Sequence, residues 1–432
     1  MSVIIRCHNE LFAIIVTSTV FDTSIAISRE NALANEEQNN FENISLACNN
    51  FASPLYKRLA YISAEMNIVI SPLNVYIMLS LLFNGAEGST LDELKSVLHF
   101  KDEISFNNEL KALIILLSDI KNNELQITNT AYVQEGIEIM DDFLTIYTHT
   151  YSNNFISFLS YIDFEYIDNA QYINYAIQVI TNNKISDVIL PEYINDDTKF
   201  VLVNTVYFKP RWLDIFDEKD TKEHMFHVSK TQKYFVPTMF KNSIYKYGII
   251  ESWRCSFIEI PYLNEDMVMI ILLPDKEITL KVLENTFNWQ TLINTLRFPS
   301  PILLYLPKFK FEITIDLENV LRKIGLNMMF EDQANFKRLS KSPLKVNRVL
   351  QKVIVEVNEK ASEFPAAKVV NVKQTSKRNK PNKRLGRSWG FIVNRPFMFA
   401  IEHKRTRMPL FVGSVRIPNI SRFARVTSND EL

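Results

Sequence analysis

Residues 203–212 read VNTVYFKPRW, and this stretch does most to decide the fold of the chain. The apolar run over residues 200–208 is continuous, rich in β-branched and aromatic residues, and short enough for a strand that is buried on both faces. Asn204 places an amide in the middle of that run, and a buried amide needs hydrogen-bond partners. The stretch therefore predicts a fully buried strand with one polar position, and Trp212 follows shortly after it.

Helical and strand-like stretches interleave on both sides of this strand. Helices are expected at 73–83, 108–120 and 316–325. Strands are expected at 126–133, 257–273 (two strands around a turn at 264–266), 303–311, 349–357, 397–401 and 410–417. The pattern predicts an α+β domain with large, mostly antiparallel sheets.

The composition is that of an ordinary globular protein, with 432 residues of which 47% are hydrophobic and 22% charged. No linker or internal repeat divides the chain, so a single domain is expected. The net charge of −1 argues neither for nor against nucleic acid or a membrane, and we expect neither as a partner. The sequence has no metal-ligand spacing, no nucleophile elbow and no glycine-rich phosphate loop, so we expect no metal, no cofactor and no enzymatic activity.

The first 26 residues have the character of a secretory signal peptide. Arg6 precedes an apolar run at 11–21, and small residues near Ala26 form a cleavage site. The alternative is a hydrophobic helix that stays in the fold. Residues 27–48 are expected to be a polar leader. The protein is therefore expected to be secreted, and the last four residues, 429–432, read NDEL and resemble signals for retention in the secretory pathway.

The chain has three cysteines and two glycosylation sequons. Cys7 would leave with the signal peptide, and the sequence leaves open whether Cys48 and Cys255 pair. Asn43 and Asn419 each begin an Asn-Ile-Ser sequon and are the predicted glycosylation sites.

Five blocks between residues 67 and 417 resemble, in order, the motifs of one protein family. They are NIVISPL with FNGAEGST (67–73, 83–90), VNTVYFKPRW (203–212), EIPY with ILLP (259–262, 271–274), LPKF with LRKIG (306–309, 321–325) and NRPF with PLFVG (394–397, 409–413). On these blocks the chain resembles the serpins, the serine protease inhibitor family. The resemblance implies about nine helices around three mostly antiparallel β-sheets, with an exposed reactive-centre loop. It places the domain at 49–420, the loop at about 360–391 and a tail at 421–432.

The resemblance also implies an activity. A serpin offers its loop as a suicide substrate for a serine-type endopeptidase. After cleavage the loop inserts into the main sheet as a new central strand and distorts the bound protease. By the same resemblance a cluster of residues lies under the main sheet. Its members are Ser71, Asn74, Asn204, Trp212 and Gln351, and Trp212 would lie beneath the point where the loop enters. Asn74 stands where the family usually has Ser, and Gln351 where it usually has His.

The hinge that leads into the loop departs from the family pattern. The predicted hinge residues are Glu359, Ala361, Ser362, Glu363, Phe364 and Pro365. Strand alternation puts Phe364 and Lys368 on the same face as Ser362, which faces inward in an inserted strand. There Phe364 overpacks, Pro365 cannot donate a ladder hydrogen bond, and Lys368 buries a charge. The alternative to an inhibitor is therefore a non-inhibitory serpin that is substrate-like or serves as a binding protein, carrier or scaffold.

Several positions remain candidates for the bond that a protease would cut. Counting forward from the hinge points to Thr375 and Ser376, and counting back from the end of the loop points towards Arg384. Together with Arg378 and Arg387, these are the candidate scissile-bond residues. The basic loop suits a trypsin-like protease, a proprotein convertase or a glycosaminoglycan, or it is simply a solvated loop. We expect a monomer.

Overall fold

The computed structural model describes residues 42–100, 103–118, 125–151, 156–166, 169–359, 389–420 and 422–423. The predicted signal peptide, the loop over 360–388 and the C-terminal tetrapeptide lie outside these residues. Within the described part, no helix combines the length and the apolar character needed to cross a bilayer.

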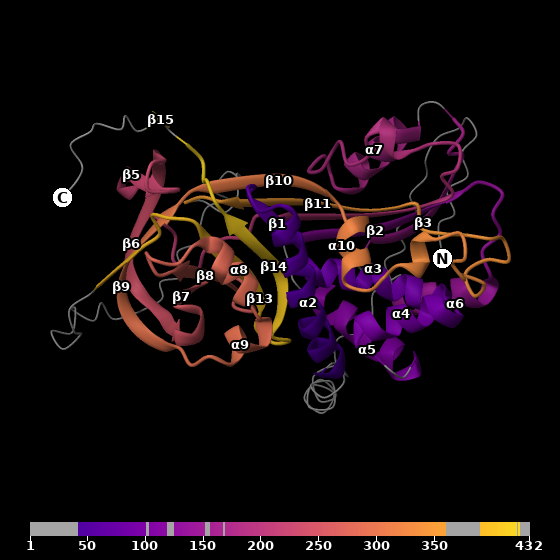
Figure 1. Cartoon of the computed structure of the whole chain (residues 1–432), viewed down its shortest axis with the longest axis horizontal. Coiled ribbons are helices and arrows are strands. Elements are labelled where there is room, and N and C mark those ends of the chain that lie inside the picture. The colour runs from indigo at the N-terminus through magenta and orange to yellow at the C-terminus, as the bar shows by residue number, and fades with distance from the viewer. Residues whose placement is uncertain are drawn as a thin grey trace, which may run out of the picture.

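A five-stranded mixed sheet forms one half of the fold (Figure 1). Its strand order is β10-β11-β4-β2-β3. The strands are β10 (Phe309–Asp316), β11 (Arg348–Val357), β4 (Phe200–Phe208), β2 (Leu125–Gln134) and β3 (Ile156–Ile162). β11 pairs in parallel with β4, and β2 in parallel with β3, while the other two pairings are antiparallel. The predicted buried strand at 200–208 is confirmed with both ends in place.

Alternating side chains of β4 pack against two different layers. Leu202 and Val206 join the main hydrophobic core. Val201 and Val203 face the other way, where they pack with residues of α7 (Asn169–Ile180) such as Ile173. Figure 1 shows α7 on one side of this sheet and α3 to α6 on the other. Because both faces are covered, apolar residues occupy both faces of the strand rather than every second position.

Helices of the N-terminal third form the layer beneath the sheet. They are α2 (Glu42–Ile62), α3 (Pro72–Gly85), α4 (Gly88–Leu98), α5 (Glu103–Ser118) and α6 (Asp141–Tyr151). Ser71 caps α3 by accepting the Asn74 N–H, and Pro72 occupies the first turn, where its missing N–H costs nothing. The predicted polar leader at 27–48 is wrong at its end, because α2 already begins at Glu42 and buries Ile44 and Cys48.

The second sheet has ten strands. We expected three sheets in all, and two of them are joined in this one. Its path runs β1-β14-β13-β8-β7-β6-β9-β12, with β5 and β15 also paired to β6. The strands are β1 (Ile68–Ile70), β5 (Lys222–His227), β6 (Lys233–Ile250), β7 (Cys255–Pro261), β8 (Met267–Pro274), β9 (Phe298–Pro307), β12 (Trp389–Ile392), β13 (Phe397–His403), β14 (Met408–Val415) and β15 (Arg422–Phe423). The described strands thus form two sheets rather than three, because the long β6 pairs with β5 near its start and with β7 near its end.

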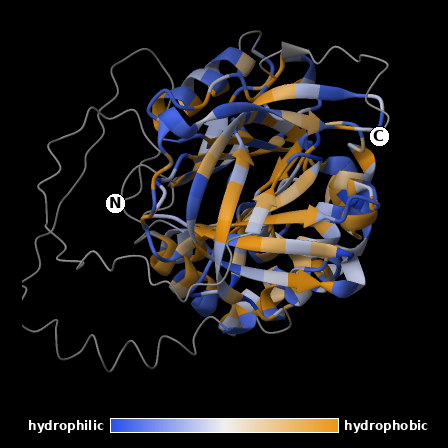
Figure 2. Ribbon diagram, turned by 90° about the vertical axis from the view of Figure 1, so that its left-hand side faces the viewer, coloured by the Kyte–Doolittle hydropathy of each residue, from blue (hydrophilic) through white to orange (hydrophobic). Residues whose placement is uncertain are grey.

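Short elements complete the fold. They are α8 (Leu280–Thr286), α9 (Trp289–Asn294) and α10 (Glu318–Lys323), with 3-10 turns at Pro191–Tyr193, Glu218–Asp220, Glu251–Trp253 and Met328–Phe330. The nine α-helices of the described residues agree with the expected number. The single strand expected at 303–311 is two strands, β9 and β10, because the chain passes from one sheet to the other at Lys308. Figure 2 shows apolar residues running along the strands and polar residues over much of the outer surface.

Candidate functional site

The seam between β4 and β11 is the place where the main sheet could accept another strand. Eight residue pairs join the two strands in parallel, from Arg348 opposite Val201 to Val355 opposite Phe208. β11 ends at Val357, and the predicted hinge follows it at once. A segment that folds back from this end would run antiparallel to both strands, and could pair with both if they separated.

A buried hydrogen bond between side chains joins the two strands of the seam. Gln351 of β11 lies directly opposite Asn204 of β4, and its Nε2 donates to Asn204 Oδ1 at 2.7 Å. Gln351 Oε1 also accepts the backbone N–H of Ser71 at 2.9 Å, at the start of α3. Both Gln351 and Asn204 are fully buried. An inserted strand would move β4 and β11 to about 10 Å apart, so this bond must break on insertion.

The polar network continues from Asn204 into β2 and α3. Asn204 Nδ2 donates to Asn129 Oδ1 at 2.6 Å, and Asn129 Nδ2 donates to Asn74 Oδ1 at 2.8 Å. Sequence reasoning missed Asn129. It stands in a largely buried strand as Asn204 does, and the two are opposite each other in the β2–β4 register. The sequence-predicted residues Ser71, Asn74, Asn204 and Gln351 therefore lie together in one connected network.

Trp212 does not belong to that network, which corrects the prediction that grouped it with the other four. Its ring stacks on Tyr262, with centroids 4.6 Å apart and an interplanar angle of 14°. Its indole N–H donates to the carbonyl oxygen of Asn358 at 2.8 Å, just after β11 ends. Trp212 therefore holds the backbone at the start of the hinge, at one end of the seam.

Glu359, the first predicted hinge residue, is anchored by two partners. Its carboxylate accepts from Thr221 Oγ1 at 2.6 Å and pairs with Lys308 Nζ at 2.7 Å. Burial alone would raise the pKa of Glu359, but the hydrogen bonds from Lys308 and Thr221 outweigh it and the pKa is lowered. The carboxylate is therefore ionised at neutral pH, and it holds the start of the hinge to Lys308, which lies between β9 and β10.

The remaining predicted hinge residues and the candidate scissile-bond residues lie outside the described residues. They are Ala361, Ser362, Glu363, Phe364, Pro365, Thr375, Ser376, Arg378, Arg384 and Arg387. The two predicted glycosylation sites are both exposed. Asn43 Nδ2 donates to Glu109 at 3.2 Å, whereas the Asn419 side chain accepts the Lys310 N–H through its oxygen.

On the other face of β11, Lys352 ties the strand to the segment that follows α7. Its side chain is 5% exposed. Nζ pairs with Glu312 of β10 at 2.7 Å and donates to the carbonyl oxygen of Ser186 at 2.6 Å. Side chains on both faces of the seam therefore fasten β11 to its surroundings, Gln351 towards α3 and Lys352 towards the α7 layer.

The two cysteines that the sequence left open do not pair. Cys48 lies in α2 and Cys255 in β7, and both are free and buried. Burial raises the pKa of both thiols well above its usual value. The described residues also contain no group of His, Cys, Asp and Glu side chains that could hold a metal ion.

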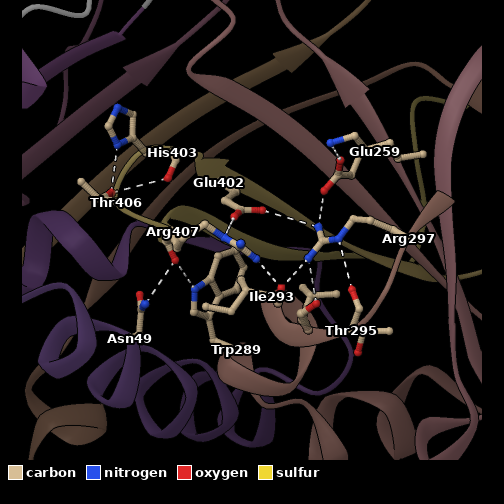
Figure 3. Close-up of polar contacts among 12 residues, drawn as sticks. Asn49, Glu259, Trp289, Ile293, Thr295, Arg297, Glu402, His403, Thr406 and Arg407 are labelled. Atoms are coloured by element: carbon tan, nitrogen blue, oxygen red, sulfur yellow. Dashed lines mark hydrogen bonds and ion pairs between the residues drawn. The ribbon is translucent and has the colours of Figure 1, made fainter. Parts of the chain in front are cut away.

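A partly buried ionic network lies away from the seam, around α9 (Figure 3). Arg297 pairs with Glu259 of β7 and lies 3.7 Å from Glu402 of β13. Arg407 Nε donates to Glu402 at 2.6 Å. Both arginines also donate to the carbonyl oxygen of Ile293 in α9. Burial raises the pKa of Glu402, and the two arginines oppose that shift. The network fixes α9 on the sheet.

Comparisons with known proteins agree with this architecture. The family model described as "Serpin (serine protease inhibitor)" matches residues 46–418. An antitrypsin of Bombyx mori is 30% identical over 358 residues, covering 82% of this chain and 89% of the relative. Intracellular coagulation inhibitor 2 of Tachypleus tridentatus is 30% identical over 416 residues, covering 93% and 96%.

Among solved structures, the chain is similar to Serpin48, described as a highly specific serpin of the insect Tenebrio molitor. The TM-score is 0.76 at 27% identity, and the match covers 87% of this chain and 98% of that one. The family match spans the main sheet, the seam and the hinge. On this evidence the chain belongs to the serpin family.

Proposed function

We propose that the protein is an inhibitor of trypsin-like serine proteases that acts as a suicide substrate by inserting its cleaved loop between β4 and β11. The observation that carries the proposal is the direct pairing of β4 with β11, with β11 leading straight into the hinge. This pairing leaves the site of insertion unused. The inhibitory names of relatives such as the Bombyx antitrypsin support the same activity.

Insertion would exchange one set of contacts for a larger one. The eight pairs of the β4–β11 ladder would be lost, but a strand between them could form ladders on both of its edges. The Gln351–Asn204 bond would be lost as well, at a cost of about 1 to 3 kcal/mol for each buried group left without a partner. The gain in backbone pairing exceeds these losses if the inserting segment fits the site.

The fit of that segment is the point at which the proposal can fail. Phe364, Pro365 and Lys368 are poor residues for a central strand, each at a cost of about 1 to 3 kcal/mol or more. If insertion is slow, the protease completes hydrolysis and releases a cleaved serpin. A non-inhibitory role as a binding protein, carrier or scaffold is therefore the second candidate function, and it rests on these three residues.

Incubation with trypsin distinguishes the two functions. The proposal predicts a complex of protein and trypsin that survives boiling in SDS, which trypsin lacking its catalytic serine does not form. If only cleaved chain appears, the inhibitory function is rejected for this protease class. The triple variant Phe364→Ala/Pro365→Ala/Lys368→Thr should then gain the complex. Failure of this variant to gain it would contradict our explanation of the defect.

The protease and the setting are part of the same proposal. The basic bait, with Arg378, Arg384 and Arg387, fits a trypsin-like pocket or a proprotein convertase, and it could also hold a glycosaminoglycan. The N-terminal signal pattern supports secretion, and the two sequons support glycosylation at Asn43 and Asn419; the secreted protein is expected to be a monomer. The NDEL end supports partial retention in the secretory pathway. Mass spectrometry of secreted protein tests the cleavage of the signal and both glycans.

A further inference from the structure

The last described residues of the chain contact the edges of both β-sheets. The family model ends at residue 418, and residues 419–420 and 422–423, which we call the strap, lie beyond it. Just before the strap, the Asn67 side chain fixes the backbone. Its Nδ2 donates to the Ile417 carbonyl oxygen at 2.6 Å, and its Oδ1 accepts the Ile417 N–H at 3.0 Å. The strap therefore starts from a fixed point on the fold.

The far end of the strap, which is β15, pairs with the start of β6. Arg422 and Phe423 lie opposite Phe235 and Tyr234 in an antiparallel ladder. β5 pairs with the same two residues of β6 from the other edge, and Figure 1 shows β15 at the same end of the fold as β5. β9 pairs with the strap's edge of β6 only from Thr238 onward. The strap thus covers backbone groups that β9 leaves unpaired, which closes an open strand edge.

Between these two points, Asn419 contacts the chain where it passes from β9 to β10. The Asn419 backbone N–H donates to the Lys308 carbonyl oxygen at 3.3 Å, and its Oδ1 accepts the Lys310 N–H at 3.2 Å. β10 ends the strand order of the five-stranded sheet, so no described strand of that sheet pairs with its outer edge. One asparagine therefore provides both the donor and the acceptor that a neighbouring strand would provide.

Lys308 connects the strap to the hinge. Its N–H donates to the Pro237 carbonyl oxygen of β6 at 2.9 Å, and its carbonyl oxygen accepts the Asn419 N–H. Its Nζ pairs with Glu359 at 2.7 Å. Glu359 is buried, so its ionised carboxylate depends on this cation. A lysine whose backbone is held on both sides loses less entropy when its side chain is fixed, and it therefore holds Glu359 more firmly.

We propose that the strap keeps the hinge closed in the uncut protein by fixing Lys308, and that loss of the strap releases the hinge. The strap acts through Lys308 and not on Glu359 directly. Release of the hinge favours entry of the loop into the seam, and that consequence rests on the proposed function. The hold on the hinge is a property of the native protein, so it is tested without a protease and can fail separately from inhibition.

Hydrogen–deuterium exchange of the uncut protein, measured on peptides that cover residues 354–359 and 306–310, tests the proposal. Removal of residues 419–432 should raise exchange in both peptides at least about 3-fold, because the lost bonds no longer oppose local opening. Removal of residues 424–432 alone keeps the strap and is the matched control, with exchange within about 1.5-fold of the parent. Peptides from β8, which is buried throughout, report any global unfolding. Unchanged exchange without the strap, or an equal rise in the control, overturns the proposal.

A double-mutant cycle tests whether the strap acts through the ion pair. Glu359→Gln removes the partner of Lys308 Nζ. In that background, removal of residues 419–432 should change exchange at 354–359 by less than about 1.5-fold, because the coupling is already lost. An equal rise in both backgrounds would mean that the strap does not act through Lys308 and Glu359, and would contradict the proposal.

A point substitution separates the strap from the proposed glycan at Asn419. A glycan on Nδ2 leaves Oδ1 available for the Lys310 N–H. Asn419→Ala loses both the glycan and this bond, whereas Ser421→Ala destroys the sequon and keeps the bond. Exchange at 306–310 should rise at least about 2-fold in Asn419→Ala and stay at the parent level in Ser421→Ala. Equal changes in the two variants would assign the effect to the glycan and contradict the role of the strap.

Discussion

Replacing Gln351 by Leu removes the side-chain link between β11 and β4 without removing its volume. The variant loses the bonds from Nε2 to Asn204 Oδ1 at 2.7 Å and to the Ser71 carbonyl oxygen at 3.2 Å, and the bond from the Ser71 N–H to Oε1 at 2.9 Å. The Ser71 carbonyl oxygen keeps the Val75 N–H as a donor, but Asn204 Oδ1 and the Ser71 N–H are left buried and unsatisfied. Two such groups cost about 2 to 6 kcal/mol together, and the apolar Leu side chain returns about 1 to 2 kcal/mol. The expected net loss of native stability is about 3 kcal/mol.

Urea unfolding of the uncleaved protein, followed by tryptophan fluorescence, measures this loss. With an m-value of about 3 kcal/mol/M, the midpoint of the first transition should fall by about 1 M. The inserted form lacks the Gln351–Asn204 bond in either protein, so the substitution destabilises only the native form. Gln351→Leu should therefore also speed conversion of the intact protein to inserted or polymeric forms on mild heating.

Gln126→Leu is the matched control, because it makes the same substitution in the same sheet. Gln126 Oε1 has no hydrogen-bond partner in the described structure. Its loss should therefore leave the midpoint unchanged or slightly higher. If Gln351→Leu shifts the midpoint no more than the control does, the link across the seam does not stabilise the native state and our reasoning is refuted.

Three further predictions concern ionisable groups. The pKa of Glu359 is below its usual value of 4.5, so its anchor stabilises the hinge above that pH and is lost as the pH falls below it. Glu359→Gln should therefore speed proteolysis of the hinge at pH 7, and the difference from the parent protein should shrink as the pH falls below 4.5. Burial lowers the pKa of His403 from 6.5 to about 4, so the unfolded chain binds the extra proton and stability falls by up to about 3 kcal/mol as the pH drops from 6.5 to 4. His403→Phe should flatten the pH dependence of urea unfolding in that window. Cys48 and Cys255 should both resist a thiol reagent in the native protein at pH 8 and react after unfolding, and rapid labelling of either native thiol would contradict their burial.

Local sequence patterns were sufficient to predict individual elements. The run at 200–208 carries apolar residues on both faces because β4 is covered on both sides, and its ends match the prediction. Helix ends were harder to predict, because packing decides them. The helix expected at 108–120 spans Glu103–Ser118 instead. The strand expected at 303–311 is divided at Lys308, because the chain changes sheets there and no local signal marks the change.

Contacts between segments that are distant in sequence could not be predicted from the sequence. The amides of Asn129 and Asn204 meet because β2 and β4 pair in a register that only the fold defines. The partners of Glu359 come from positions 221 and 308, and neither could be named in advance. The sequence grouped Trp212 with Ser71, Asn74, Asn204 and Gln351, but it lies apart from their network and donates to the Asn358 carbonyl oxygen instead, and its place beneath the point of loop entry stays a prediction.

The melting temperature of the protein before and after cleavage of its loop by trypsin tests the central claim most directly. Mass spectrometry first establishes that cleavage lies between the hinge and β12. If the cleaved loop inserts between β4 and β11, the melting temperature rises by at least about 10 °C. An unchanged melting temperature would mean that the seam does not accept the loop, and would contradict the inhibitory function proposed for this serpin.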